Sequence, residues 1–200
     1  MTRVKICGIT RVEDGLAAAA SGADAIGLVF WPQSPRFVTL DQARTVVEKL
    51  PPFVTVVGVY VDPEPRTVEE SIAAVRLDLL QFHGDEPPEF CRQFARPYIK
   101  AVRVRQGLDL LQYASRYRQA RGLLLDTFVD GMAGGTGVEF DWNLIPKDLP
   151  LPVILSGGLT TGNVARAIER IKPWGVDVSS GVEAAKGIKD PRKISGFMQG

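Results

Sequence analysis

Short runs rich in Val, Ile and Leu recur along the whole 200-residue chain, and segments with helical character separate most of them. Strands of this composition are typical of a parallel sheet that helices cover. The repeated alternation of strand and helix restricts the chain to α/β architectures. Eight strands are predicted, at 3–7, 25–30, 53–61, 77–82, 98–104, 122–126, 151–156 and 175–180.

The predicted helices carry their own start and stop signals. Thr10 is the expected N-cap of the first helix, with Glu13 three residues later as in a capping box, and Gly22 ends that helix. Asp190 is the expected cap of the last helix. Cys91 lies on a helix with apolar neighbours and is expected to be a small core residue. The predicted helices cover 10–23, 39–50, 66–75, 86–95, 108–120, 161–171 and 190–199.

Eight strands with helices between them predict an α/β fold, a compact (β/α)8 TIM barrel that forms a single domain over residues 1–200. The length is at the short end for this fold, so the loops must be short. The alternative is a doubly wound open sheet. We favour the barrel because there are eight strands, and because "SGGL" and "GGTG" do not form the dinucleotide fingerprint G-x-G-x-x-G after a first strand.

Charge and composition argue against several function classes. Lys and Arg number 24 and Asp and Glu 23, so the formal net charge of +1 gives no reason to expect nucleic acid or membrane as a partner. No apolar run could span a bilayer, and the N-terminal "TRVK" shows no export signal. Two distant cysteines and a single histidine argue against a disulfide framework and a metal site. We expect a cytoplasmic protein with free thiols and no cofactor.

Polar residues and glycines gather where the predicted strands end. The active site of such a barrel lies at the carboxyl ends of its strands. Cys7 and Gly8 end the first strand, "WPQSPRF" follows the second, His83 ends the fourth and Asp126 the sixth. Turns rich in Gly and Ser, "SGGL" and "SSGVE", follow the last two strands. The sequence therefore predicts a polar site at this end of the barrel.

These strand ends carry motifs that occur together in one known family. "KICGIT", "SPRFV", "QFHGDE", "LLLD", "GGTGVEFDW", "SGGL" followed by "NVARAI", and "VDVSSGVE" with "GIKD" appear in this order. From residue 4 to its C-terminus the chain resembles the phosphoribosylanthranilate isomerases of tryptophan biosynthesis. Each motif alone is weak to moderate, whereas the ordered set is highly specific. In two places the chain departs from the family, which usually has Leu where Phe82 stands and commonly Ala where Ser156 stands.

The resemblance implies an isomerase that converts N-(5-phosphoribosyl)anthranilate to 1-(2-carboxyphenylamino)-1-deoxyribulose 5-phosphate, an Amadori rearrangement, by general acid/base catalysis. The reaction needs an acid for the ring oxygen, a base for the proton on the neighbouring sugar carbon, a phosphate site and an anchor for the carboxylate. The expected partner is this small phosphosugar-anthranilate substrate. The chain itself is expected to be a monomer or a homodimer.

By this resemblance Cys7 is the catalytic base and Asp126 the acid. Strand alternation puts Lys5 on the same face as Cys7, and a nearby ammonium favours a thiolate, so we expect Lys5 to lower the pKa of Cys7. Asp126 follows three leucines, and partial burial favours the neutral form of a carboxyl group, which suits a proton donor. The alternatives are an inert buried cysteine and an aspartate that caps its own loop.

The remaining polar strand ends are expected to bind substrate. By resemblance Arg36 holds the anthranilate carboxylate, which a guanidinium group matches with two hydrogen bonds. Asp177 either faces the amine or hydroxyls of the substrate or forms an internal ion pair with Lys5. His83, with Gln81 on its face of the strand, is expected to support the site by hydrogen bonding rather than to act as acid or base.

Backbone amides in the glycine-rich turns are expected to bind the phosphate, because barrels often do so after strands seven and eight. "VEAAKG", directly after the last such turn, is the expected short extra helix of this site. The long loop "DGMAGGTG" is expected to close over the substrate as a lid. Simple tight turns are the alternative. The expected phosphate-binding residues are Gly134, Gly135, Gly157, Gly158, Ser180 and Gly181.

Other functions would need other residues at the strand ends. A ribulose-phosphate epimerase would call for metal ligands or paired aspartates, and a two-aspartate isomerase of histidine and tryptophan intermediates would need Asp in place of Cys7. A protein that only binds a phosphorylated ligand would keep the glycine turns yet would tolerate the loss of Cys7 and Asp126. Since both residues are present, the isomerase is favoured.

Overall fold

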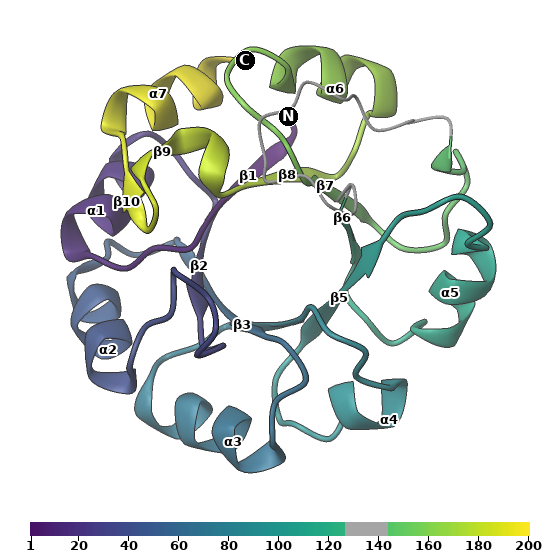
Figure 1. Ribbon diagram of the computed structural model, residues 1–200, viewed down its shortest axis with the longest axis horizontal. Coiled ribbons are helices and arrows are strands. Elements are labelled where there is room, and N and C mark those ends of the chain that lie inside the picture. The colour runs from purple at the N-terminus through teal and green to yellow at the C-terminus, as the bar shows by residue number, and fades with distance from the viewer. Residues whose placement is uncertain (127–143) are drawn as a thin grey trace.

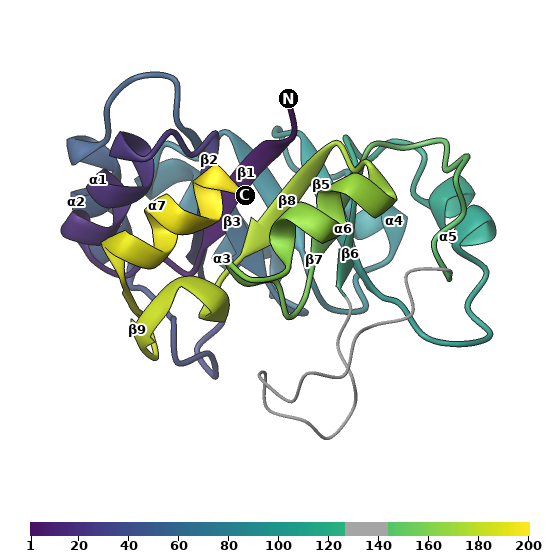
Figure 2. The same cartoon turned by 90° about the horizontal axis from the view of Figure 1, so that it is seen from above.

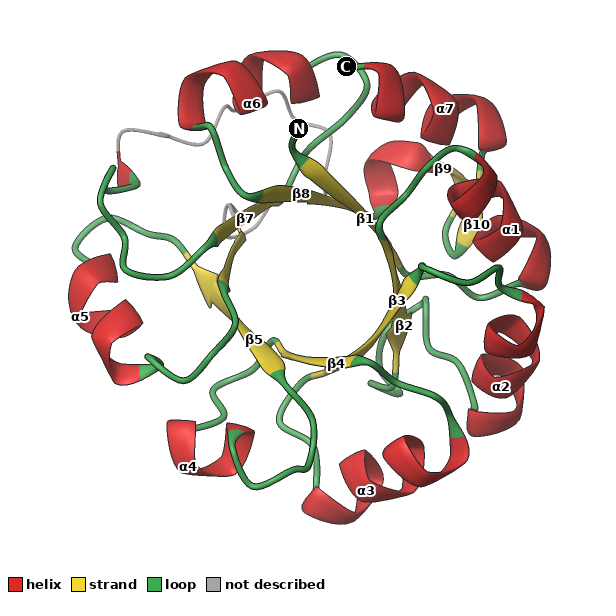
Figure 3. Ribbon diagram, turned by 180° about the vertical axis from the view of Figure 1, so that it is seen from behind, coloured by secondary structure: helices red, strands yellow, loops and turns green. Residues whose placement is uncertain are grey.

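The computed structural model describes residues 1–126 and 144–200, and its eight parallel strands close into a barrel with the helices around the outside (Figure 1). This confirms the predicted (β/α)8 TIM barrel. Figure 3 shows the same ring of strands from the opposite side. The strands are β1 (Arg3–Cys7), β2 (Ala25–Val29), β3 (Thr55–Tyr60), β4 (Leu79–Phe82), β5 (Tyr98–Arg103), β6 (Leu123–Asp126), β7 (Val153–Ser156) and β8 (Gly175–Val178).

Helices follow most of the strands, and two further short strands precede the last helix. A 3-10 helix, η2 (Ser180–Val182), leads into an antiparallel ribbon of β9 (Glu183–Ala185) and β10 (Ile188–Lys189). No helix in residues 1–126 and 144–200 is long and apolar enough to cross a membrane. The helices are α1 (Val12–Ala20), α2 (Leu40–Lys49), α3 (Pro65–Ala74), α4 (Pro88–Cys91), α5 (Leu110–Arg116), α6 (Val164–Ile171) and α7 (Pro191–Gln199).

The barrel closes because β1 pairs with both β2 and β8. Lys5 of β1 stands opposite Ala25 on one side and opposite Asp177 on the other. All eight strands run parallel, so their carboxyl ends lie at one end of the barrel. Figure 2 shows β9 at this end and the N-terminus of the chain at the other.

Strand alternation divides the buried side chains between the barrel interior and the layer beneath the helices. Ile6 and Leu28 belong to the large core that packs against the helices, whereas Cys7, Val57 and Val59 form a separate small cluster. Because successive residues of a strand point to opposite faces, this second set lies inside the barrel. The functional side chains of β1 therefore share the barrel interior with apolar neighbours.

The first helix begins differently from the prediction. Thr10 does not cap it: α1 begins at Val12 with Arg11 as N-cap, and Thr10 Oγ1 instead donates to the carbonyl of Gly187 at 2.5 Å. A contact 177 residues away along the chain thus replaces the local capping bond. The predicted end is confirmed, since Gly22 follows the helix with a φ of +91°.

Two other local predictions are confirmed, although one helix is shorter than expected. Asp190 caps α7 by accepting hydrogen bonds from the backbone of Arg192 and Lys193. Cys91 is fully buried in the main core, but α4 ends with it, so Phe94 lies beyond the helix.

Phe82, where the chain departs from the family pattern, belongs to a buried aromatic cluster. Its ring centroid lies 5.7 to 6.0 Å from those of Tyr60, Phe90, Phe94 and Tyr98. These rings fill the layer between β4 and the outer elements. The larger side chain at this position therefore has a packing role on the outside of the barrel.

Candidate active site

Cys7 lies at the carboxyl end of β1, beside a buried ion pair. Lys5 Nζ donates to Asp177 Oδ1 at 2.7 Å, and both side chains are less than 8% exposed. Ser156 Oγ donates to the other oxygen of Asp177 at 3.1 Å. The structure thus shows the ion-pair alternative for Asp177. The serine, where the family commonly has alanine, holds the second oxygen of that carboxylate.

Lys5 acts on the pKa of the Cys7 thiol in the expected direction, but burial acts more strongly. Burial raises the pKa of Cys7 above its ordinary value, and the ammonium of Lys5 offsets this only in part. Asp177 also raises it, because a carboxylate beside Lys5 weakens the positive field at the sulfur. The predicted effect of Lys5 is therefore confirmed, whereas the loss of water around the thiol could not be predicted from sequence spacing.

Two glycines make room for this cluster. Gly27 stands opposite Cys7 on β2, and a Cβ there would lie 2.8 Å from Cys7 Sγ and 3.1 Å from Lys5 Nζ. Gly8 has a φ of +74°, and a Cβ on it would collide with Cδ of Arg36. The absence of a side chain at Gly27 leaves room for the thiol of Cys7 and the ammonium of Lys5. The absence of one at Gly8 leaves room for the side chain of Arg36.

Arg36, in the loop after β2, is held by a carboxylate that sequence reasoning missed. Its Nε and Nη2 donate to the two oxygens of Glu183 at 2.6 and 2.7 Å. Lys189 Nζ lies 3.0 Å from Glu183 Oε1. Burial alone would raise the pKa of Glu183, but the hydrogen bonds from Arg36 and Lys189 hold it below its ordinary value. The partners are 147 residues apart, so no local pattern could reveal them.

The segment "VEAAKG" is not the extra helix that we expected. Val182 ends the single 3-10 turn η2, and the following residues form the ribbon of β9 and β10, which turns at Gly187 with a φ of +77°. The ribbon places the side chain of Glu183 on Arg36, while Lys189 on the facing strand also donates to the backbone oxygen of Ser179. These buried contacts outweigh the helical propensity of the two alanines.

Asp126 and His83 meet on the other side of the barrel end. Asp126 ends β6 with its side chain 18% exposed, and its Oδ2 lies 3.0 Å from His83 Nε2. Gln81 Nε2 lies 3.0 Å from His83 Nδ1. The structure thus gives His83 two hydrogen-bonding partners, one of them the expected acid.

The turns after β7 and β8 lie against each other. Gly157 and Gly158 have φ values of +84° and +64°, and a Cβ on Gly158 would meet no atom within 4 Å. Ser180 and Gly181 belong to η2, and a Cβ on Gly181 would collide with the carbonyl of Leu159. The backbones of these two turns are thereby in contact at the carboxyl end of the barrel.

The other expected phosphate-binding residues, Gly134 and Gly135, lie outside the described residues, as does the predicted lid "DGMAGGTG". Within the described residues, no group of three or more His, Cys, Asp and Glu side chains could hold a metal ion.

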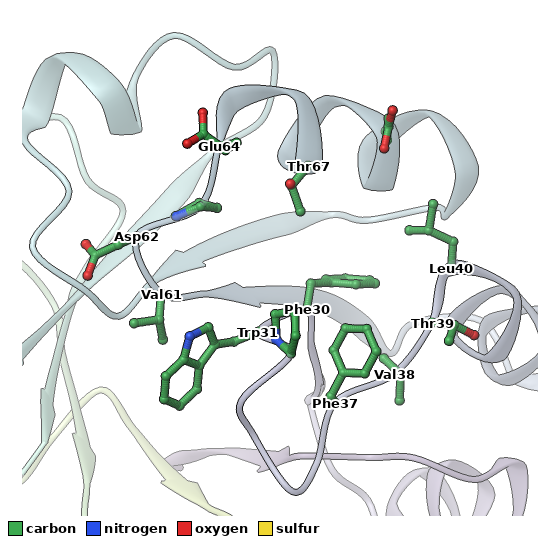
Figure 4. Close-up of a pocket in the computed structure, with 13 residues that line it drawn as sticks. Phe30, Trp31, Phe37, Val38, Thr39, Leu40, Val61, Asp62, Glu64 and Thr67 are labelled. Carbon is green, nitrogen blue, oxygen red and sulfur yellow. The ribbon is translucent and has the colours of Figure 1, made fainter.

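A groove of about 380 Å³ lies beside this site, between the segments that follow β2 and β3. Figure 4 shows Phe30, Trp31 and Phe37 along one side of it and Glu64 and Thr67 on the other. None of the expected catalytic or substrate-binding side chains lines it. The groove is therefore a separate feature of the surface.

Comparisons with known proteins agree with this arrangement. The family model of N-(5′-phosphoribosyl)anthranilate (PRA) isomerase matches residues 4–200. The N-(5′-phosphoribosyl)anthranilate isomerase of Nitrosospira multiformis is 68% identical over 198 residues, which are 99% of this chain and 95% of the relative.

Solved structures of such isomerases have the same fold. The phosphoribosyl anthranilate isomerase of Thermotoga maritima has a TM-score of 0.92 at 44% identity, and the match covers 100% of this chain and 98% of that one. An isomerase in complex with reduced 1-(o-carboxyphenylamino)-1-deoxyribulose 5-phosphate has a TM-score of 0.88, also at 44% identity, over 100% and 97% of the two chains. A third structure, with a TM-score of 0.88 at 41% identity over the same shares, shows monomers generated from the dimeric T. maritima enzyme. This chain belongs to the N-(5′-phosphoribosyl)anthranilate isomerase family.

Proposed function

We propose that Cys7 and Asp126 carry the two main proton transfers of the isomerisation that this family catalyses in tryptophan biosynthesis. The observation that carries this assignment is their placement. Both end strands of the same closed barrel, with only β7 and β8 between them on the shorter path around it. A thiol and a carboxyl group at one barrel end can act on one sugar from two sides.

In this proposal Asp126 begins the reaction as a general acid. It gives its proton to the ring oxygen while the bond from that oxygen to the first sugar carbon breaks, which leaves an open-chain iminium at the anthranilate nitrogen. Cys7, as the thiolate, then takes the proton from the second sugar carbon. The released electron pair forms a double bond to the first carbon and neutralises the nitrogen. The resulting enol becomes the ketone when its hydroxyl proton leaves and a proton adds to the first carbon.

Arg36 is the proposed anchor for the anthranilate carboxylate. Glu183 takes hydrogen bonds from Nε and Nη2 of its guanidinium group. A guanidinium group carries five N–H donors, so the edge formed by Nη1 and Nη2 can still bind a second carboxylate with two bonds. The ion pair with Glu183 supports this role because it fixes the orientation of that edge before substrate arrives.

The phosphate site is proposed at the backbone amides of Gly157, Gly158, Ser180 and Gly181. The contact of these two turns and the open space above Gly158 support it. Asp177 is proposed to hold Lys5 beside the thiol, an assignment supported by the ion pair of 2.7 Å. Direct contact of Asp177 or His83 with substrate stays a prediction.

The proposed function is tested by following the loss of anthranilate-type fluorescence as freshly generated N-(5′-phosphoribosyl)anthranilate is consumed. Wild-type protein should turn the substrate over. Arg36→Met should raise KM by about ten- to a hundredfold with a smaller effect on kcat, because a charge-assisted pair of bonds to the substrate is lost. Lys189 keeps Glu183 paired in this variant.

The matched control is Arg66→Met on the surface of α3, where the side chain is 87% exposed and pairs only with Glu70 among the described contacts. Its kinetics should equal those of the wild type. Absence of wild-type turnover would refute the function, and an unchanged KM in the Arg36 variant would refute the anchor.

The expected assembly, a monomer or a homodimer, stays a prediction. The dimeric relative from T. maritima supports the homodimer. The cytoplasmic location likewise stays a prediction from the sequence.

A further inference from the structure

We propose that Gln81 is a positioning residue for the catalytic acid. In this proposal it fixes which ring nitrogen of His83 carries the proton, and His83 in turn orients the carboxyl group of Asp126. The inference rests on the proposed role of Asp126 and adds a residue to it. The contacts of Gln81 carry the argument.

Gln81 is a polar side chain in an apolar layer of the barrel interior. It lies on β4 opposite Val59 of β3 and Ile99 of β5, and it is only 1% exposed. Its Oε1 has no hydrogen-bond partner within the described residues. A buried amide oxygen without a partner is unfavourable, and an apolar side chain of similar size would avoid this cost. Packing therefore gives no reason for a glutamine here.

The other end of the amide does have a partner. Gln81 Nε2, which can only donate, lies 3.0 Å from His83 Nδ1. A nitrogen that accepts this bond cannot itself carry a hydrogen. The proton of the neutral imidazole is then on Nε2, which donates to Asp126 Oδ2 at 3.0 Å. In this series of hydrogen bonds, the donor from Gln81 therefore determines that His83 donates to Asp126.

The direction of the hydrogen bond between His83 and Asp126 determines which oxygen of Asp126 carries the acidic proton. Because Asp126 Oδ2 accepts from His83, the acidic proton of Asp126 is placed on Oδ1, where the substrate can take it. With the opposite tautomer, His83 Nε2 would be an acceptor, and the acidic proton would be held in a bond to the ring. After proton transfer, the N–H of His83 stabilises the carboxylate that forms. Loss of this arrangement should therefore lower kcat without weakening substrate binding.

The proton position can be observed without any activity measurement, because His83 is the only histidine of the chain. Nitrogen-15 NMR of uniformly labelled protein gives one pair of imidazole nitrogen signals, which distinguishes the two tautomers. The wild type should show a protonated Nε2 and an unprotonated Nδ1. A protonated Nδ1 in the neutral ring, or a rapid mixture of tautomers, would overturn the proposal.

Two substitutions at Gln81 test the link to catalysis. Gln81→Leu removes the donor but fills the same space, so we expect a mixture of His83 tautomers, a melting temperature that is not lowered, and kcat reduced by about ten- to a hundredfold with KM unchanged. Loss of the partner behind a metal-binding histidine has effects in this range. Gln81→Glu accepts a hydrogen from Nδ1, so it should favour protonation of Nδ1 and reduce kcat further.

Ile99→Val, at the register partner of Gln81 on β5, is the matched control. It changes packing in the same layer and should leave the His83 signals and kcat as in the wild type. A Gln81→Leu protein that keeps the wild-type tautomer and wild-type kcat would refute the inference. A loss of kcat in that variant that occurs only together with a lowered melting temperature would also refute it, because the role would then be structural. Full turnover in Asp126→Asn would instead refute the proposed function, whatever the NMR spectra of His83 show.

Discussion

Replacing Cys7 with alanine is expected to reduce kcat by about 10²- to 10⁴-fold, the contribution typical of a positioned acid or base. Alanine cannot take a proton from the sugar carbon, and nothing else on β1 replaces the thiol, since Lys5 is occupied by Asp177 at 2.7 Å. KM should change little because the proposed anchors of the carboxylate and phosphate are untouched. The fluorescence assay with wild type and variant measures both constants.

The second cysteine provides a matched control for this change. Cys91 is fully buried in the main core, with its Sγ 3.7 Å from the carbonyl oxygen of Glu86. Cys91→Ala should keep wild-type turnover and lose about 1 kcal/mol of unfolding free energy, because a small cavity replaces the sulfur. If Cys7→Ala kept its turnover while Cys91→Ala lost it, the roles of the two thiols would be reversed.

Asp126→Asn is expected to lower kcat to a similar degree, again about 10²- to 10⁴-fold. The amide has nearly the same shape and can still accept the hydrogen bond from His83, but it has no carboxyl proton to give to the ring oxygen. Substrate binding and the folded structure should therefore persist. Single-turnover measurements should place the loss before product release.

Asp24→Asn, at the opposite end of the barrel, is the matched control for Asp126→Asn. Asp24 Oδ2 accepts a hydrogen bond from the backbone N–H of Val4 at 2.8 Å, just before β2 begins. In Asp24→Asn an amide oxygen can accept that bond, so turnover should remain at the wild-type level. Equal losses in the two asparagine variants would mean that the effect at Asp126 is a general consequence of removing a carboxylate.

The strands and their ends could be predicted because they depend on local composition. The predicted bounds of the first strand, 3–7, are the observed ones, and alternation along it puts Lys5 and Cys7 on one face. The closed topology then brings Asp177 of β8 against Lys5, so one of the two roles foreseen for this aspartate is observed. Periodicity thus predicts which side chains share the barrel interior.

Contacts between distant segments could not be predicted in the same way. The pairing of Arg36 with Glu183 depends on a ribbon whose sequence favours a helix, and the buried contacts of Glu183 and Lys189 stabilise that ribbon. The pKa of Cys7 depends on how completely the folded barrel excludes water from the thiol. The spacing of residues in the sequence predicts neither the pairing of Arg36 with Glu183 nor the pKa of Cys7.

The identity of Cys7 as the base is tested most directly by comparing two pH profiles in a Cys91→Ala, Asp126→Asn protein, where Cys7 is the only thiol. Because an amide replaces the proposed acid, only the thiolate fraction of Cys7 governs the pH dependence of the residual activity. The first is the rate of alkylation of Cys7 by iodoacetamide in the free enzyme, which follows the thiolate fraction. The second is kcat/KM, which reports the pKa values of the free enzyme. Because burial raises the pKa of Cys7, both should be low at neutral pH and rise together as pH increases beyond the ordinary range of a thiol. A kcat/KM that stays constant while the alkylation rate climbs would show that the thiolate of Cys7 does not remove the proton.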